Sequence, residues 1–434
     1  MNPNFSVHPN NFSSLMLFGL SLGNYALMFV ANVFLARQLS IEAFDDYSVS
    51  VSVVTLLSTL ATLGLDKYAL RLVALNIERE NWGRLRSFLR FSTRTILLFS
   101  CVLLVILSVT LEGILAWKQA DFHISIVIYA AFLPIIAISL FLIEIVTVFG
   151  FQIMALALYR ACLPGLFIIF LFVVWQSNIA QSAVSSVICL GLAWCATLFL
   201  LITAAKIVCP QALRRAKPDS QDRRKWISKA LPLLIGSLMM TILTNAGTIV
   251  LELLHPSEMQ VGLFSVIMQT SGLLVLIGTS TNRYYLPMLM VLLERRDAKG
   301  IKRLLHKRTR LITGFLILYL SAIVFLGAEI LALFGRDFSE GYLALCISTL
   351  GAAINTLYSD APYYLQFMGQ NRAVVYWMAF SAIGMLVLSF LLGLRYGATG
   401  VAIAYALPTA ILFCSLKLRA SRHLRHYLAL NAPV

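Results

Sequence analysis

Three charged residues stand close together near the end of a long apolar run: Asp66, Lys67 and Arg71. Residues four apart share a helix face, so Lys67 and Arg71 stack while Asp66 points elsewhere. Counted at ~1.5 Å per residue from Tyr47, Asp66 lies near the far edge of a bilayer core. Charges at that depth snorkel to the interface, pair with each other or face a polar cavity. The stretch is therefore either a snorkelling helix end or the polar gate of a transporter.

Further charges lie inside apolar stretches later in the chain. Glu144 and Arg160 flank Gly150 within the long apolar stretch 122–175, so a helical hairpin that turns there puts them at similar depth. They form either a packing ion pair or part of a gate and substrate path. Asp360 lies among tyrosine and asparagine side chains. Its carboxylate is suited to a cation, a proton or a sugar, or it caps an interfacial helix beside an aromatic belt.

Amide side chains form a third set of candidates: Asn24, Asn32 and Asn245. Amides commonly hold membrane helices together, so helix packing is the default interpretation for each of them. Asn24 and Asn32, however, are separated by nearly two helical turns, which gives the first span one polar face. That face is suited to line a cavity.

Composition identifies the setting of these residues. The 434 residues are 60% hydrophobic and 12% charged, whereas about one quarter of a soluble chain is charged. The chain is therefore an all-α, polytopic membrane protein. The net charge of +15 recurs in every second connection and not in one patch, which indicates membrane orientation and excludes nucleic acid as a partner.

Motifs for catalysis and metal binding are not found in the sequence. The seven cysteines include no CxxC pair, so disulfides and structural zinc are not expected. The sequence contains no HExxH, GxSxG or P-loop motif. We therefore expect neither an enzyme nor a metal protein.

Twelve apolar stretches of about 20 residues predict twelve transmembrane helices, with both termini cytoplasmic. The predicted spans are 12–36, 47–73, 94–117, 122–148, 152–175, 182–205, 230–253, 261–286, 311–334, 341–367, 372–394 and 397–416. The cut between the fourth and fifth is placed at Phe149–Gln152. Basic residues fill the connections on one side, including 295–310 and the C-terminal tail.

The longest basic connection, 206–229, divides the chain into a six-helix lobe over 1–205 and a second over 230–434 with a basic cytoplasmic tail. A shift of 217 residues places Gly83 on Gly300 and Arg86 on Arg303. Six spans per half give both lobes the same orientation, so a pseudo-twofold axis runs along the membrane normal and a cleft lies between the lobes.

The same shift places Asp66 on Arg283, at matching depth in opposite lobes. We expect these two residues to meet across the cytoplasmic end of the cleft and to close it when the protein faces outward. The alternative is that each side chain snorkels or pairs within its own lobe.

The first two spans carry a family resemblance. The segment from Val30 to Arg71 resembles the start of the O-antigen and exopolysaccharide flippases of the multidrug/oligosaccharidyl-lipid/polysaccharide exporter superfamily. Such flippases have a short turn of the form ARxLxxxxFxxY and a second span that ends in GLxxxxxR. The matching positions here are Ala36, Arg37, Leu39, Phe44, Tyr47, Gly64, Leu65 and Arg71.

The resemblance implies two lobes in a V, as in the multidrug exporters, around a cationic cleft that alternates between inward and outward access. The substrate would be an oligosaccharide linked to undecaprenyl pyrophosphate, moved from the cytoplasmic to the periplasmic leaflet of a bacterial inner membrane for O-antigen, capsule or exopolysaccharide synthesis. A pyrophosphate needs buried cations, and the candidates are Lys67, Arg71, Arg283 and Arg160. Membrane lipid would hold the prenyl tail, and a polysaccharide polymerase and a chain-length regulator are expected partners.

Two alternatives remain. A drug or cation antiporter of the same superfamily generally uses a carboxylate in its first or seventh span. The predicted first span here has none, and a cationic cleft repels cationic drugs.

Ion coupling after Asn245, where many relatives have an acid and this chain has Ala246, is in doubt. No cofactor is expected beyond coupling to a proton or sodium gradient. A polysaccharide polymerase or ligase would need a large external loop, which the sequence does not offer.

Overall fold

The computed structural model describes residues 11–118, 124–177, 181–219, 223–255, 259–295 and 297–429, and the regular structure in these residues is helical throughout. The first half contains α1 (Asn11–Gln38), α2 (Ile41–Ala61), α3 (Leu65–Glu78), α4 (Trp82–Lys118), α5 (Ile124–Ala130), α6 (Leu133–Val148), α7 (Gln152–Ala157), a π-helical turn η1 (Leu158–Cys162), α8 (Leu163–Gln176), α9 (Ala183–Val208) and α10 (Gln211–Arg215). The second half contains α11 (Arg223–Leu254), α12 (Gln260–Glu294), α13 (Ala298–Ala332), a 3-10 turn η2 (Arg336–Gly341), α14 (Tyr342–Tyr358), α15 (Ala361–Phe367) and α16 (Asn371–Ala429).

The prediction of twelve membrane spans agrees with these helices. Among the described residues, ten helices are long and apolar enough to cross a membrane, and the pair α5 and α6, bent by 45°, forms an eleventh span. Helix α16 holds two spans, because its backbone leaves helical geometry at Gly397. The break predicted at Phe149–Gln152 is also confirmed, since α6 ends at Val148 and α7 begins at Gln152.

The second predicted span, 47–73, falls within one candidate span of the structure, Ile41–Glu78, but the helix of this span is not continuous. It is interrupted between α2 and α3, where Leu63 and Gly64 have φ angles of 52° and 70°. A Cβ on Gly64 would lie 2.5 Å from the carbonyl oxygen of Ala230 on α11. Glycine is required there, because it adopts a positive φ without strain and lets the two backbones approach closely. The break sets the start of α3, the helix that carries Lys67 and Arg71.

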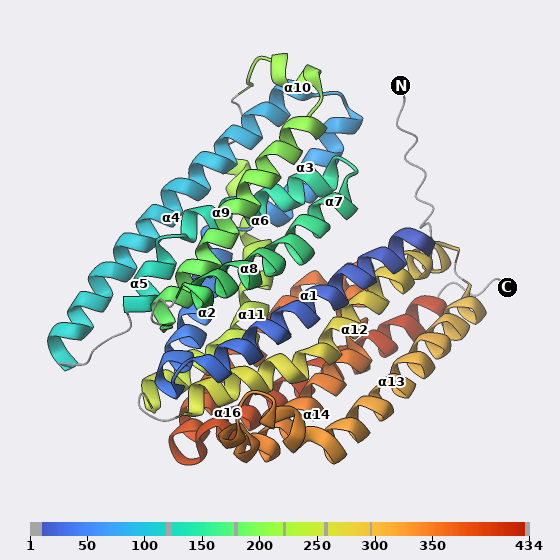
Figure 1. Cartoon of the computed structure of the whole chain (residues 1–434). Helices are drawn as coiled ribbons and strands as arrows, with labels where there is room; N and C mark the ends of the chain where they lie inside the picture. Colours follow the sequence, from blue (N-terminus) through green and yellow to red (C-terminus); the bar gives the residue numbers. More distant parts are fainter. Residues whose placement is uncertain are drawn as a thin grey trace.

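The helices form two groups that converge at one end and diverge at the other (Figure 1). The N-terminal group comprises α2–α9 and the C-terminal group comprises α12–α16, while α1 and α11 each pack against both groups. Helix α10, the first turn of α1 and the last turn of α16 lie at the diverging ends. The basic connections that predict the cytoplasmic side are at these ends, so the V opens toward the cytoplasm.

Contacts between the two groups close the converging end. The backbone N–H of Gly262 donates to Asp45 Oδ1 at 2.8 Å, and a Cβ on Gly262 would lie 2.4 Å from that oxygen. Close by in the sequence, Arg37 Nε donates to the carbonyl of Leu333 at 2.6 Å. The rings of Phe44 and Phe338 pack edge to face with centroids 5.9 Å apart. Apolar burial and charge-assisted hydrogen bonds therefore hold the external end shut.

Candidate functional site

A cationic cavity of about 770 Å³ lies between α3 and α11. Two of the predicted substrate-binding residues, Lys67 and Arg71, line it from α3. Three further cations line it as well: Arg79, Arg84 and Lys229. In the described part of the chain, no carboxylate belongs to the lining, and Arg71, Arg79 and Lys229 form no ion pair. The cavity therefore presents uncompensated positive charge.

Helix α3 presents these cations because of its spacing and its start at Gly64. Lys67 and Arg71 are four residues apart, so their side chains emerge on one face of the amphipathic helix, and Arg79 is the residue that caps the C-terminal end of α3. The opposite face carries Leu65, Ala69 and Val73, which are fully buried. Burial of that face fixes the direction in which the cations point.

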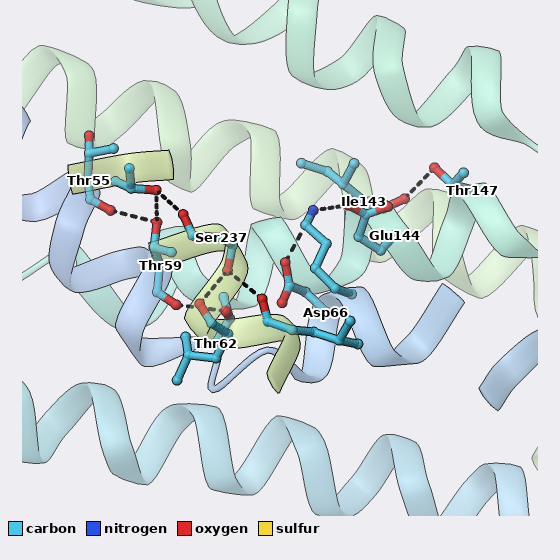
Figure 2. A network of polar contacts seen from close by, with 12 residues as sticks. Thr55, Thr59, Thr62, Asp66, Ile143, Glu144, Thr147 and Ser237 are labelled. Atoms are coloured by element: carbon cyan, nitrogen blue, oxygen red, sulfur yellow. Dashed lines mark hydrogen bonds and ion pairs between the residues drawn. The ribbon is translucent and has the colours of Figure 1, made fainter. Parts of the chain in front are cut away.

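The ammonium group of Lys67 lies between two carboxylates. Its Nζ is 2.5 Å from Glu144 Oε1 on α6 and 3.4 Å from Asp66 Oδ2. Figure 2 shows this arrangement, with Asp66 and Glu144 on either side of the lysine ammonium. The two carboxylates compensate the charge of Lys67 within the N-terminal group, so Arg71, Arg79 and Lys229 provide most of the positive potential of the cavity.

The predicted partner of Glu144 was Arg160, which lies on the π-helical turn η1. A π-helical turn inside a helix often marks a functional position. The ring of Tyr159, on the same turn, is within electrostatic reach of Arg160, Lys67 and Glu144. The structure therefore brings these three predicted residues into one neighbourhood, with Lys67 as a direct partner of Glu144.

The predicted gate joined Asp66 to Arg283 across the cleft. Asp66 is buried, with 7% of its surface exposed, and its Oδ2 atom faces Lys67. Arg283 belongs to α12, and its side chain lies outside the described residues. The Asp66–Arg283 contact stays a prediction.

A second cavity, the inner cavity, lies toward the closed end and has a volume of about 370 Å³. Two of the predicted amides, Asn32 on α1 and Asn245 on α11, line it. Asn32 Nδ2 donates to Gln269 Oε1 on α12 at 2.8 Å, which links α1 to the C-terminal group. Asn24, the third predicted amide, is partly buried on α1 and lines neither cavity.

Asp360 lies at the break between α14 and α15 and is 1% exposed. Its Oδ1 is 3.0 Å from Arg308 Nη1 and its Oδ2 is 3.3 Å from Lys417 Nζ. Arg308 also donates from Nη2 to Asn282 Oδ1 and Ser359 Oγ, both at 2.9 Å. The carboxylate predicted for a cation, proton or sugar is therefore the centre of a buried ion triad in the C-terminal group.

Sequence reasoning missed several of these cations, because it assigned them to solvent-exposed connections. Arg308 was counted in the basic loop 295–310, but α13 begins at Ala298 and Arg308 is 2% exposed. Lys417 was assigned to the tail and Arg84 to a loop. The position of Arg308 in the sequence could have indicated its burial. It lies ten residues after Ala298, the first residue of α13, and ten helical residues reach well into the bundle.

The fold and the two cavities define a multi-pass, all-helical membrane protein built from two groups of helices. The chain belongs to the polysaccharide biosynthesis protein family, whose model matches residues 10–293. No curated protein sequence matches it significantly.

Solved structures share the fold at low sequence identity. The lipid II flippase MurJ in an inward closed conformation matches with a TM-score of 0.72 and 17% identity over 96% of this chain and 90% of that one. A multidrug resistance MATE family transporter of the MOP superfamily in an inward-facing conformation matches with a TM-score of 0.68 and 14% identity over 96% of both chains. An outward-facing conformation described in the same words has a TM-score of 0.60, with 14% identity over 96% of both chains.

Proposed function

We propose that this protein is a flippase that moves oligosaccharides linked to undecaprenyl pyrophosphate from the cytoplasmic to the periplasmic leaflet of a bacterial inner membrane. The product would feed the synthesis of a surface polysaccharide such as O-antigen, capsule or exopolysaccharide. The observation that carries the proposal is the cavity between α3 and α11, with five cations and no described carboxylate in its lining. Family membership in polysaccharide biosynthesis supports the same class of substrate.

The chemistry of the cavity fits a pyrophosphate group. Arginine guanidinium groups bind phosphate oxygens through paired, charge-assisted hydrogen bonds. Arg71 lies on α3, Arg79 caps the C-terminal end of that helix, and Lys229 lines the same cavity from α11. A substrate headgroup that enters from the cytoplasmic leaflet meets these cations first, while its prenyl tail stays in lipid. The same cations would repel a cationic drug, which disfavours the antiporter alternative.

Alternating access would carry the bound headgroup across. In the inward-open arrangement the contacts between Asp45 and Gly262 and between Arg37 and Leu333 close the external end. Rocking of one helix group against the other would break these contacts and close the cytoplasmic side, as expected for exporters built from two halves. Asp66 and Arg283 are the residues that we propose to meet on the closed cytoplasmic side. A proton or sodium gradient is the proposed energy source, and the polymerase and chain-length regulator are the proposed downstream partners.

Two measurements test the proposal: the binding of undecaprenyl pyrophosphate to variants, and the membrane face on which lipid-linked repeat units accumulate. Arg71→Gln and Arg79→Gln in lipid nanodiscs should each weaken binding of undecaprenyl pyrophosphate about tenfold or more, because a hydrogen bond to a charged group is worth about 1.5–3 kcal/mol. The matched control is Lys302→Gln, an exposed cation on α13 that lines neither cavity. In cells that lack the protein, lipid-linked repeat units should accumulate on the cytoplasmic face. Accumulation on the periplasmic face would instead identify a polymerase or ligase and refute the flippase.

A further inference from the structure

The inner cavity differs in chemistry from the cationic cavity. Its lining carries no charged side chain among the residues that the structure describes. It is formed instead by hydroxyls, amides and two tyrosines, interleaved with methionine and valine, from five helices: α1, α2, α11, α12 and α16. Its volume of about 370 Å³ lies within the range of about 300–1,000 Å³ that small-molecule sites occupy.

Two polar atoms in this lining have no hydrogen-bond partner among the described residues: Ser48 Oγ and Asn32 Oδ1. Ser48 is 3% exposed, so its hydroxyl is enclosed by protein. Buried hydroxyls and amides in folded proteins are nearly always bonded, because an unbonded one loses its hydration without replacement. Asn245 adds an amide that donates to Thr241 O and Thr244 Oγ1, which orients its carbonyl oxygen as a further acceptor. The cavity is thus arranged to receive a ligand with several hydroxyl groups.

A stripe of hydroxyls leads from the inner cavity toward the cationic cavity. On α2 it comprises residues that recur every three or four positions and share one face: Ser48, Ser52, Thr55, Thr59 and Thr62. Ser237, Thr241 and Thr244 repeat the pattern on α11, and Thr59 Oγ1 lies 3.2 Å from Thr241 Oγ1 where the stripes meet (Figure 2). Along the chain, 15 positions separate Ser52 in the lining of the inner cavity from Lys67 in the lining of the cationic cavity.

We propose that the inner cavity is the glycan subsite and that it selects uncharged sugars over sugars that carry a carboxylate. This inference rests on the proposed function, because it assigns the sugar end of the same substrate whose pyrophosphate binds the cations near α3. A neutral sugar exchanges water for the hydroxyls and amides of the cavity. A uronic acid would give up part of the hydration of its carboxylate against a lining that offers no cationic side chain among the described residues.

Paired substrates test the selectivity. Proteoliposomes with the purified protein would be given undecaprenyl-pyrophosphate disaccharides that end in glucose or in glucuronic acid. We expect the glucose form to be moved at least about tenfold faster, since a site built for hydroxyl groups discriminates strongly against a mismatched polar group. If both forms are moved at equal rates, the glycan subsite is refuted while the flippase stands. If neither form is moved, the proposed function itself fails.

Substitution of two serines on α2 distinguishes an effect on sugar binding from an effect on protein stability. Ser48→Ala removes an unpartnered hydroxyl, so we expect unchanged or higher thermal stability together with about threefold weaker binding of the glucose form. Ser50→Ala is the matched control, because Ser50 Oγ bonds Asp46 O at 2.7 Å and Ser125 Oγ at 3.0 Å, and Ser50 lies outside the cavity. It should lower stability and leave sugar selectivity unchanged. Equal selectivity and binding in Ser48→Ala and the wild type would overturn the inference.

A charge introduced into the cavity provides a second, independent variant. Asn245→Lys places an ammonium group in the lining, where it supplies the counter-ion that a uronic acid lacks. We expect the preference for glucose over glucuronic acid to fall about tenfold or to reverse, with binding of undecaprenyl pyrophosphate unchanged. An unaltered preference in a folded Asn245→Lys protein would count against the inner cavity as the sugar site.

Discussion

The ion triad around Asp360 permits a quantitative prediction. Its carboxylate is 1% exposed and faces Arg308 at 3.0 Å and Lys417 at 3.3 Å. Asp360→Asn preserves the shape of the side chain and removes its charge. The Arg308 guanidinium, which is 3% exposed, would then be buried without a counter-ion. Removal of one partner of a buried pair costs about 3–5 kcal/mol, mostly because the other charge stays buried.

The expected effect on thermal stability follows from chain length. At about 2.1 cal/mol/K of unfolding entropy per residue, 434 residues give roughly 1 °C per kcal/mol, so Asp360→Asn should lower the midpoint by about 3–5 °C. Lys417→Met should cost about 1 kcal/mol or less, because the side chain of this lysine is 28% exposed and water screens the pair.

The assay is thermal denaturation of the purified protein in detergent, followed by the loss of its monodisperse size-exclusion peak. Arg308→Met and the double variant Asp360→Asn/Arg308→Met complete a double-mutant cycle. The double variant should lose much less than the sum of the single losses, since it leaves no isolated charge in the core. Additive losses within about 0.5 kcal/mol would show that the charges do not interact and would refute the reasoning.

Three further substitutions test two sites where a glycine lies close to a neighbouring helix and the ion pair between Lys67 and Glu144. Gly64→Ala should misfold or lower stability by several kcal/mol, because φ is 70° and the new Cβ meets α11 backbone, whereas Gly19→Ala, with open space around it, should not. Glu144→Gln frees the paired lysine, so pyrophosphate binding in nanodiscs should tighten about two- to fivefold; weaker binding would contradict this. Gly262→Ala pushes against Asp45 at the closed end, so maleimide added from outside should label faster a cysteine introduced into the inner cavity by Ser265→Cys, in a chain without its native cysteines; an unchanged rate would contradict this.

Most of the fold was predictable, because hydropathy and loop charge are strong signals in a membrane chain. Span count, the break near Gly150 and the V all follow from apolar length, arginine distribution and the resemblance. The break at Gly64 was not predictable in the same way. The apolar run continues across it, and the requirement for glycine comes from the backbone of Ala230, which is 166 residues away in the sequence.

The candidate site was predictable only in part. Lys67 and Arg71 stood out as charges at the end of an apolar run, and both line the cationic cavity. Arg308 did not stand out, because a basic loop and the mostly exposed first turns of the following helix look alike in sequence. The hydroxyl stripe from Ser48 to Thr62 was readable from its spacing of three and four. Serine and threonine are common in membrane helices, however, and only the facing stripe on α11 gives the pattern meaning.

The hydrogen bonds of the threonines between α2 and α11 determine how readily these two helices separate. Its threonines are already bonded within their own helices, as in Thr55 to Val51 O at 2.7 Å, Thr59 to Thr55 O at 3.0 Å and Thr241 to Ser237 O at 3.0 Å. Of these three, Thr59 and Thr241 alone reach across the interface. Parting the helices there forfeits one hydrogen bond and turns no unsatisfied threonine toward hydrocarbon. A seam of this kind can part and re-form with the loss of few polar contacts, which the proposed rocking of the two helix groups requires.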